Sequence, residues 1–543
     1  MMDFVIANMA PIIFVSMIVF LLFGFPVAFA LAANGIVFGL IGIELGLLGP
    51  QLFQALPDRI YSVMTNETML AVPFFTFMGL ILERSGMAED LLDTIGQLFG
   101  PIRGGLAYAV IFVGALLAAT TGVVAASVIS MGLISLPIML HYGYDKRLAS
   151  GVIAASGTLA QILPPSLVLI VMADQLGKSV GDMYRGAFIP GLVLTALYVL
   201  YVILIALFRP KWAPALPAEA RTFRESNGTM GGTSLIVLTV TALIVGTVFA
   251  KTRPDNTPTD ELVVMCIMVG VSVPFLMALI NRALKLGLLS AIAERVTFVL
   301  IPPLALIFLV LGTIYLGVAT PTEGGAMGAT GALLMALLRK RLDLKLLKQA
   351  MQSTAKLTTF AIFILIGSRV FSLTFYGVDG HVWVEHLLVD LPGGKYGFLI
   401  TVNILVFLLA FFLDYFELSF IIVPLLGPVA EKLGIDLIWF GVLLAINMQT
   451  SFLHPPFGFA LFFLRSVAPP SVKSSDIYWG AIPFVCIQVL MVLLVIAIPQ
   501  LVTLGLDHNQ AQVDLDSVQM EIPDTHYDDP ETVEPPALSL PAE

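Results

Sequence analysis

Charge is scarce in this chain. Only 12% of its 543 residues are charged and 58% are hydrophobic, and the mean hydropathy is +0.97. A soluble protein of this length cannot bury so much apolar surface. Apolar runs of about 20 residues recur, long enough to cross a bilayer, so we expect an all-α polytopic membrane protein. Much of the acid behind the net charge of -10 lies in the C-terminal tail, and we expect no nucleic-acid partner.

Cysteine and catalytic motifs are also scarce. The two cysteines, Cys266 and Cys486, lie in apolar runs, and we expect small core residues rather than a disulfide. No His-Glu-x-x-His motif occurs. His381 and His386 flank Glu385 at the wrong spacing for an inverted zinc motif, in an expected external loop. The absence of a P-loop argues against ATP-driven transport by this chain alone.

An intramembrane hydrolase would need a nucleophile and a base at membrane depth. Ser156 with His454 is the only pair that could serve, and nothing else in the sequence supports it. We therefore expect a protein that is not an enzyme.

A repeat organises the chain. The Pro164-Pro165 pair and the Pro455-Pro456 pair each interrupt an apolar helix, 291 residues apart. The flanks also correspond, since Asp182-Met183-Tyr184 follows the first pair and Asp476-Ile477-Tyr478 follows the second. Two halves that each contain a broken helix are typical of secondary transporters. Irregular backbone at membrane depth must be buried or line a wet cavity, so the breaks are where we expect a binding site.

Each half also contains a long apolar block with a polar interruption. Residues 105–141 are interrupted at Thr120-Thr121-Gly122, and residues 397–432 are interrupted at 413–417. At ~1.5 Å per residue each piece is too short to cross a bilayer comfortably, so the sequence predicts two re-entrant hairpins. We expect broken helices at 147–174 and 438–465, an amphipathic stretch at 47–63, and further spans near 4–24, 26–43, 67–83, 187–208, 234–250, 261–281, 297–318, 322–338, 356–376 and 480–504.

Basic residues set the expected orientation. Arginines and lysines cluster at the ends of the first hairpin and in the loops at 209–230 and 339–350. Placing them in the cytoplasm puts the N-terminus outside and inverts the second half relative to the first. The expected segments are scaffold helices (1–104), the first hairpin and broken helix (105–174), connecting helices with a two-span insertion (175–296), second scaffold helices (297–396), the second hairpin and broken helix (397–466), a last helix (467–506), and an external disordered acidic tail (507–543).

The first candidate site combines the first hairpin tip with the first break. Hairpin tips and broken helices present hydroxyls, backbone carbonyls and helix ends, which suit Na⁺. Packing between helices is the alternative role for any single hydroxyl. We assign Thr120, Gly122 and Gly157 to Na⁺, and Thr121, Ser156, Thr158 and Gln161 to the substrate.

The second candidate site combines the second tip with the second break. Asp414 and Glu417 share a face if helical, and two acids in an apolar block must meet water, protein or an ion. The alternative is a pair held near the aqueous surface. For His454 we favour a capping role beside Pro455. We assign Asp414, Glu417 and Thr450 to Na⁺, and Asn447, Gln449 and Ser451 to the substrate.

Two further charged residues lie in apolar spans. Arg369 could contact an anion or pair with Asp379 or Glu385, and we favour a structural pairing or snorkelling. For Glu323 we favour an N-terminal helix acid that complements the dipole.

The chain resembles the large, DctM-like membrane subunit of a TRAP (tripartite ATP-independent periplasmic) transporter. The resemblance covers about residues 10–505 and rests on Arg84-Ser85-Gly86-Met87, Arg103-Gly104-Gly105, Thr121-Gly122, Ile162-Leu163-Pro164-Pro165, Ala319-Thr320-Pro321-Thr322-Glu323 and Leu413-Asp414. It implies an elevator-type, Na⁺-coupled transporter in the bacterial inner membrane. It also implies a small four-span (DctQ-like) membrane subunit, a periplasmic (DctP-like) substrate-binding protein, and a small organic acid as substrate.

Some features depart from the common family pattern. The two spans at 234–281 and the acidic tail are additional, and with His454-Pro455-Pro456 they resemble the mannitol/chloroaromatic branch. A stand-alone Na⁺/dicarboxylate carrier of related fold is the alternative function. A channel fits less well, because two inverted halves with broken helices indicate alternating access.

Overall fold

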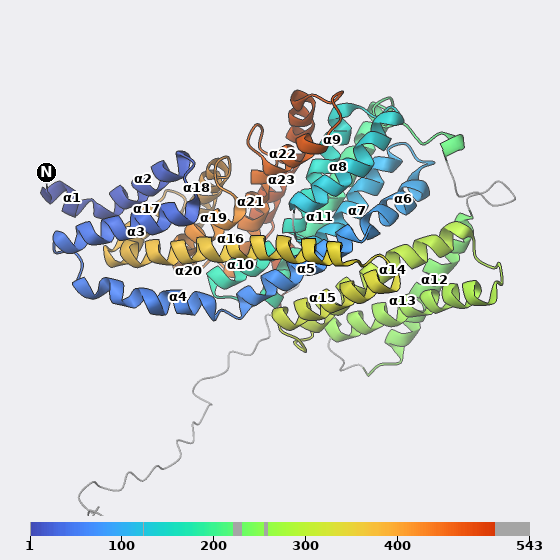
Figure 1. Cartoon of the computed structure of the whole chain (residues 1–543), viewed down its shortest axis with the longest axis horizontal. Coiled ribbons are helices and arrows are strands. Elements are labelled where there is room, and N and C mark those ends of the chain that lie inside the picture. The colour runs from blue at the N-terminus through green and yellow to red at the C-terminus, as the bar shows by residue number, and fades with distance from the viewer. Residues whose placement is uncertain (1, 123, 221–230, 255–258, 505, 507–543) are drawn as a thin grey trace, which may run out of the picture. The chain divides into compact units, whose positions relative to one another are not determined.

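The helices of the first half follow the expected order. The computed structural model describes residues 2–122, 124–220, 231–254, 259–504 and 506, and all regular elements in these ranges are helical (Figure 1). The elements up to the end of the first repeat are α1 (Met2–Ala7), α2 (Met9–Leu22), α3 (Val27–Glu44), η1 (Pro50–Ala55), α4 (Leu56–Met64), η2 (Thr68–Leu70), α5 (Ala71–Arg84), α6 (Met87–Phe99), α7 (Gly105–Thr121), α8 (Val124–His141), α9 (Lys146–Thr158), η3 (Leu159–Gln161), α10 (Leu167–Leu176) and α11 (Val180–Phe208).

The second half follows a short connection and the additional pair of helices. The connection contains η4 (Ala218–Ala220), and the additional pair is α12 (Gly232–Lys251) and α13 (Thr259–Leu284). The elements of the second half are α14 (Ala291–Tyr315), α15 (Pro321–Leu338), α16 (Leu344–Gly377), α17 (Gly380–Val389), α18 (Gly394–Leu409), α19 (Tyr415–Ile421), α20 (Val423–Lys432), α21 (Leu437–Met448), η5 (Gln449–Phe452), α22 (Phe459–Val467), α23 (Ser474–Ala497) and α24 (Gln500–Thr503). Within the described ranges, eight helices are long and apolar enough to cross a membrane, or up to ten if two bent pairs each count as one span.

Both predicted hairpins and both predicted breaks are present. The first hairpin turns after α7 at Gly122, whose φ of 57° is a left-handed conformation that glycine adopts without penalty. The second hairpin is interrupted between α18 and α19, where Asp414 begins α19. Pro164-Pro165 and Pro455-Pro456 each lie between two shorter helices, where proline lacks the amide that would continue the helical hydrogen bonds.

Four element predictions were wrong or incomplete. The helix α6 was not predicted, and α17 occupies a segment that we expected to be an external loop. The helix α16 begins 12 residues earlier than the predicted span, at Leu344, and α11 begins at Val180 rather than near 187. Residues 221–230 and the tail from 507 lie outside the described residues, so the predictions for them and the finer domain boundaries stay predictions.

The long helices pair across the two halves. Helix α3 packs along α16, and α5 packs along α15. Gly35 and Gly367 allow the first of these contacts, since a Cβ on Gly367 would lie 2.4 Å from the carbonyl oxygen of Ala28. Helices α3 and α5 of the first half therefore rest on α16 and α15 of the second.

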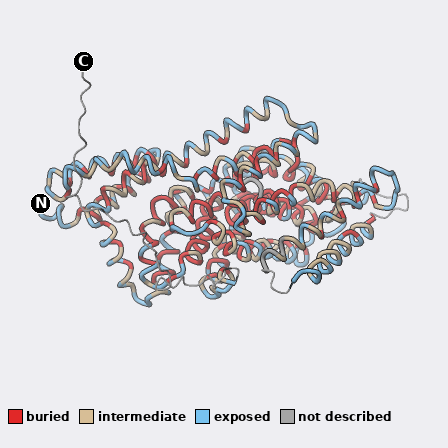
Figure 2. The backbone as a smooth tube through the Cα atoms, turned by 90° about the horizontal axis from the view of Figure 1, so that it is seen from below, coloured by how far each residue is buried: buried red, intermediate tan, exposed pale blue. Residues whose placement is uncertain are grey.

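The first pieces of the two broken helices, α9 and α21, are almost wholly buried. Every residue of α9 from Leu148 to Thr158 is buried, and so is nearly all of α21, whereas most of α12 is exposed. Figure 2 shows the backbone coloured by burial, with buried stretches in red. Helix α9 packs closely on α23, where a Cβ on Gly151 would lie 2.1 Å from the carbonyl oxygen of Gly480. Cys486 on α23 is exposed, so its prediction as a core residue was wrong; both cysteines are free.

The basic ends of the helices meet on one side. The amide of Asp145 donates to the carbonyl of Trp212, and the Lys146 ammonium donates to the carbonyl of Ser471. Arg341 donates to the carbonyl of Ser85, and Arg84 contacts Gln349 and Ser353 on α16. These contacts join segments that the sequence assigns to the cytoplasm, and that assignment stays a prediction.

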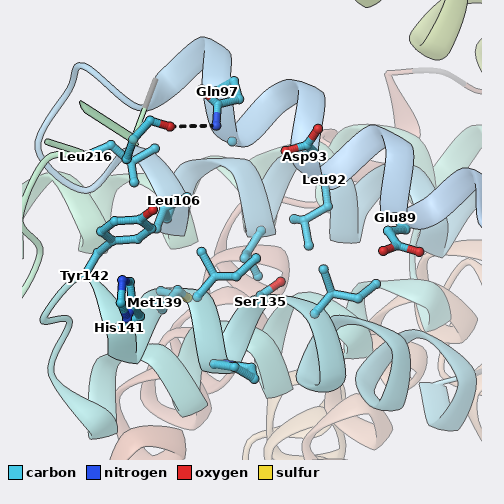
Figure 3. Close-up of a pocket in the computed structure, with 16 residues that line it drawn as sticks. Glu89, Leu92, Asp93, Gln97, Leu106, Ser135, Met139, His141, Tyr142 and Leu216 are labelled. Atoms are coloured by element: carbon cyan, nitrogen blue, oxygen red, sulfur yellow. Dashed lines mark hydrogen bonds between the residues drawn. The ribbon is translucent and has the colours of Figure 1, made fainter. Parts of the chain in front are cut away.

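Helix α6 lies beside the first hairpin and leaves a large cavity against it. The cavity has a volume of about 640 Å³ and is lined from α6 by Glu89, Asp93 and Gln97, and from α8 by Ser135 and His141 (Figure 3). No residue that we assigned to Na⁺ or substrate lines it, so we place the candidate site elsewhere.

Candidate transport site

The two helix breaks meet directly. The side-chain amide nitrogen (Nε2) of Gln449 in η5 donates to the hydroxyl of Thr158 at the end of α9, over 3.1 Å. The Thr158 hydroxyl donates in turn to the carbonyl of Ala155 over 2.8 Å. A second amide, Gln488 on α23, approaches the same hydroxyl at 3.5 Å and donates to Tyr198. All these polar side chains are buried, so each hydrogen bond replaces one to water.

A small cavity opens beside this contact, between both tips and both breaks. Its volume is about 230 Å³. The first half contributes the tip residue Gly122 and the break residue Gln161, and the second half contributes Asp414. The other lining residues are Val72 and Thr76 of α5, Leu357 and Phe360 of α16, and Val124, Ala125, Leu167, Val168, Tyr415, Phe416, Phe452, Phe459 and Phe463. We call this space the junction cavity.

Helix ends converge on the junction cavity. Val124, Leu167 and Phe459 are the first residues of α8, α10 and α22, and all three line it. The N-terminus of a helix has unpaired N–H groups and a partial positive charge, which favours anions. Gly122 and Gln161 stand at the ends of α7 and η3, where carbonyl oxygens favour cations.

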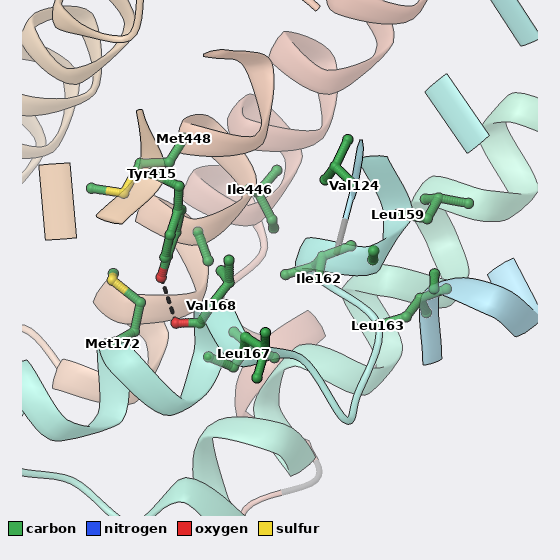
Figure 4. Close-up of a cluster of buried hydrophobic side chains, with 14 of the residues drawn as sticks. Val124, Leu159, Ile162, Leu163, Leu167, Val168, Met172, Tyr415, Ile446 and Met448 are labelled. Atoms are coloured by element: carbon green, nitrogen blue, oxygen red, sulfur yellow. Dashed lines mark hydrogen bonds between the residues drawn. The ribbon is translucent and has the colours of Figure 1, made fainter. Parts of the chain in front are cut away.

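An apolar cluster packs beside the junction cavity. The hydroxyl of Tyr415 donates to the carbonyl of Val168, which joins α19 of the second half to α10 of the first (Figure 4). Leu167, Ile162 and Val124 lie near this bond, and all are buried. Packing of this kind holds the two helix ends at a fixed separation.

The residues predicted in the first half divide between cavity and core. Gln161 lines the junction cavity, and its carbonyl oxygen Oε1 is buried without a hydrogen-bond partner. Ser156 is fully buried and donates to the carbonyl of Val152, while Gly157 makes room for Val128 of α8. The side chains of Thr120 and Thr121 lie outside the described part of the structure.

Asp414 and Glu417 form a reciprocal cap on α19. The Asp414 carboxylate accepts from the Glu417 amide over 2.8 Å, and the Glu417 carboxylate accepts from the Asp414 amide over 2.8 Å. Asp414 lines the junction cavity, but Glu417 lines a different cavity with Gly24 and Pro26. An ionised carboxylate has about four acceptor sites, so this cap leaves Asp414 able to bind a cation as well.

Most of the residues predicted around the second break hydrogen-bond to other protein groups. Asn447 donates to the backbone and side-chain oxygens of Asn403 on α18, and Thr450 donates to the carbonyl of Asn447. The Ser451 hydroxyl is buried without a hydrogen-bond partner. Asp414 lines the junction cavity together with Phe452 of the second break and Gln161 of the first.

The side chains of His454 and Glu323 both contact neighbouring parts of the protein. The ring of His454 stacks on Phe411 with centroids 4.1 Å apart and meets Phe407 edge-on. His454 therefore packs against the C-terminal end of α18 and the residues just after it. Thr320 and Glu323 form a capping box at the start of α15, so the role favoured for Glu323 at a helix N-terminus is confirmed.

Sequence reasoning missed the contribution of the long helices to the cavity. Thr76 of α5 is buried with an unpartnered hydroxyl, and Phe360 of α16 also lines the junction cavity. A threonine and a phenylalanine in apolar spans carry no local signal of a site. Their role depends on which spans pack against the hairpins.

Comparison with known proteins identifies the family. Residues 14–501 match the family model described as "Tripartite ATP-independent periplasmic transporter, DctM component". The chain belongs to this family. The family is one of membrane transport, which agrees with the expected absence of enzymatic activity and with a multi-pass membrane protein.

Individual relatives are more distant. The chain is 26% identical over 455 residues to the C4-dicarboxylate TRAP transporter large permease protein DctM of Pseudomonas aeruginosa, covering 83% of this chain and 89% of that one. It is 22% identical over 454 residues to the 2,3-diketo-L-gulonate TRAP transporter large permease protein YiaN of Escherichia coli, covering 83% and 90%. Among solved structures it is similar to the Alcanivorax borkumensis YdaH transporter, with a TM-score of 0.47 and 14% identity over 84% of this chain and 88% of that one.

Proposed function

We propose that this TRAP large permease subunit moves a small organic acid into the cell together with Na⁺, and that both bind in the junction cavity. The names of the two relatives, a C4-dicarboxylate and a diketo-gulonate permease, support a small carboxylate as substrate. The volume of about 230 Å³ suits such a ligand, because pockets for larger, drug-sized ligands start at roughly 300 Å³.

The charge inside the junction cavity is the observation that carries this proposal. Asp414 is the one carboxylate among the described lining residues, and none of them is Lys, Arg or His. An organic anion that entered this space alone would face a carboxylate of the same sign without a basic partner. A Na⁺ ion held by Asp414 and by carbonyls at the ends of α7 and η3 removes that repulsion, so the acid would bind well only with the ion.

The substrate carboxylate would lie against the starts of α8, α10 and α22, and its carbon skeleton against the phenylalanines. Gln161 offers an amide whose carbonyl oxygen lacks a partner. Of the remaining assigned residues, Thr158 and Gln449 would hold the two breaks together rather than touch the substrate, because they hydrogen-bond to each other.

Motion of the hairpins and breaks against the long helices would give access from alternate sides. Both parts line the junction cavity, because Val72 and Phe360 belong to α5 and α16 while most of the rest belong to the hairpins and breaks. The two halves would be inverted relative to one another in the bacterial inner membrane. The small membrane subunit and the periplasmic binding protein would complete the transporter.

Reconstituted uptake tests this proposal. We expect the purified chain in liposomes to show little uptake alone, and strong uptake with the small subunit, the loaded binding protein and an inward Na⁺ gradient. The ligand is first found as the compound that raises the melting temperature of the binding protein. Robust uptake by the chain alone would instead identify a stand-alone carrier, and uptake indifferent to the Na⁺ gradient would contradict the coupling.

A further inference from the structure

A second cavity, of about 340 Å³, contains two arginines. Arg59 of α4 and Arg369 of α16 both line it, together with the hydroxyl residues Ser368, Ser372 and Tyr376. Its remaining lining residues are Gln175, Leu373 and Pro424. We call it the arginine cavity.

Three helical segments run from the junction cavity to the arginine cavity. Along α10 the lining residues pass from Val168 to Gln175, and along α16 they pass from Phe360 to Arg369. Along α19 and α20 they pass from Phe416 to Pro424. At ~1.5 Å per helical residue each path covers about 10–14 Å, so the two cavities are neighbours along one route.

The arginine cavity lies at the end of that route opposite the basic side of the molecule. Helix α16 starts at Leu344, close to the contacts of Arg341 and Arg84, and Arg369 is about two turns from its other end at Gly377. By the orientation derived from the sequence this end is periplasmic. A periplasmic opening is where an incoming substrate would arrive.

Neither arginine has an acidic partner in the part of the chain that the structure describes. No ion pair within 4.0 Å joins Arg59 or Arg369 to a described acid, and Nε of Arg369 is buried without a hydrogen-bond partner. Among the described residues, neither Asp379 nor Glu385 forms an ion pair with Arg369, and Glu385 pairs with Lys432.

The nearest carboxylate on α10 is already engaged. Asp174 accepts from Asn66 and from Gln175, each over 2.7 Å. An unpaired guanidinium in a partly closed space is costly unless an anion joins it, and its planar donors match a carboxylate.

We infer that the arginine cavity is an outer vestibule that binds the carboxylate of the arriving organic acid before it enters the junction cavity. This inference rests on the proposed function for the identity of the anion. Arg59 lies on α4 and Arg369 on α16, whereas Gln175 lies on the first broken helix and Pro424 on the second hairpin. An anion held there would thus sit where the two parts of the molecule meet.

Charge-selective labelling tests the vestibule without knowledge of the natural substrate. The full-length chain carries Cys266→Ser and Cys486→Ser, and a thiol is introduced by Ser372→Cys inside the cavity. Labelling rates are measured in phosphatidylcholine nanodiscs with an anionic and a cationic methanethiosulfonate reagent, and Leu387→Cys on the exposed face of α17 serves as the reference position.

We expect the anionic reagent to be favoured at the Ser372→Cys position by about tenfold relative to the reference. Arg369→Gln or Arg59→Gln should abolish most of this preference, Arg369→Lys should retain part of it, and Arg103→Gln at the opposite end should leave it unchanged. Succinate, as a carboxylate probe, should slow labelling in the unmodified background and not in Arg369→Gln. Equal reagent preference at both positions would overturn the vestibule.

Two further measurements separate the sources of the anion and the underlying function. Protection by phosphatidylglycerol in the nanodisc, without protection by succinate, would identify a lipid headgroup site and overturn the substrate vestibule. In reconstituted uptake, Arg369→Gln should raise KM several-fold with little change in kcat. An unchanged KM would overturn the substrate vestibule. Failure of uptake in the unmodified transporter would instead count against the proposed function and leave the labelling result standing.

Discussion

Thr158 and Gln449 touch each other, and they are separated by the same 291 residues that separate the two Pro-Pro pairs. They therefore occupy corresponding positions in the two halves. Positions that correspond under a two-fold relation come into contact only near the axis that relates the halves. This contact supports a site built around that axis, with the junction cavity beside it.

The bond between Thr158 and Gln449 should contribute to stability as a pair. Gln449→Leu removes the donor and Thr158→Val removes the acceptor for two amides, and each should cost about 1–3 kcal/mol because buried polar atoms lose their partners. The double variant should cost less than the sum by about 1 kcal/mol. Unfolding in mixed detergent micelles measures these values. Strict additivity would show that the two side chains do not interact.

The contact between α9 and α23 should tolerate no side chain at Gly151. A Cβ there would lie 2.1 Å from a backbone oxygen, which cannot move without shifting α23. We expect Gly151→Ala to destabilise the protein by about 3 kcal/mol. Gly232→Ala, on a helix start with no atom within 4 Å, is the matched control and should be nearly neutral. The folded fraction after heating distinguishes them, and equal stability of both variants would refute the packing.

Cross-linking should reveal whether the first hairpin moves against the long helices. Ser130 on α8 donates to the Glu83 carboxylate on α5 over 2.6 Å. In the double variant Glu83→Cys, Ser130→Cys, a short bifunctional thiol reagent should abolish uptake, and reduction should restore it.

The matched control lies wholly within the long helices. Arg84 on α5 contacts Gln349 on α16 over 3.3 Å, so the double variant Arg84→Cys, Gln349→Cys tests a cross-link between elements that stay together. Uptake should survive this cross-link. Uptake that also survives the Glu83–Ser130 cross-link would contradict the proposed motion.

The hairpins and breaks could be predicted from the sequence because they depend on local backbone chemistry. Gly122 ends α7 in a left-handed conformation, and Pro164-Pro165 and Pro455-Pro456 end helices in stretches that also carry polar residues. By contrast, Pro302-Pro303, in an apolar run, stays inside α14. Helix α6 was missed although its apolar residues recur with helical spacing, because at 13 residues it is too short for a search based on spans. Helix α17, with 10 residues, was missed for the same reason.

The site could be predicted only in part. Gly122, Gln161 and Asp414 line the junction cavity, and each sits at a break that the sequence reveals; their roles toward Na⁺ and substrate stay predictions. Ser156 and Asn447 are also polar and also precede a break, yet they are buried and hydrogen-bond to backbone carbonyls, of Val152 and Asn403 respectively. Which way a side chain turns depends on tertiary packing, and a single sequence contains no signal for that.

The Na⁺ dependence of uptake in Asp414→Asn is the most direct test of the transport site. Asparagine is as good a helix N-cap as aspartate, so the variant keeps the cap on α19 and its stability while it removes the charge. We expect the half-saturating Na⁺ concentration to rise about tenfold or more, which corresponds to ~1.4 kcal/mol of lost ion binding. Glu417→Gln, whose side chain lies in a different cavity, should change it less. An unchanged half-saturating Na⁺ concentration in a folded, assembled Asp414→Asn transporter would contradict the account and leave Asp414 as a structural cap.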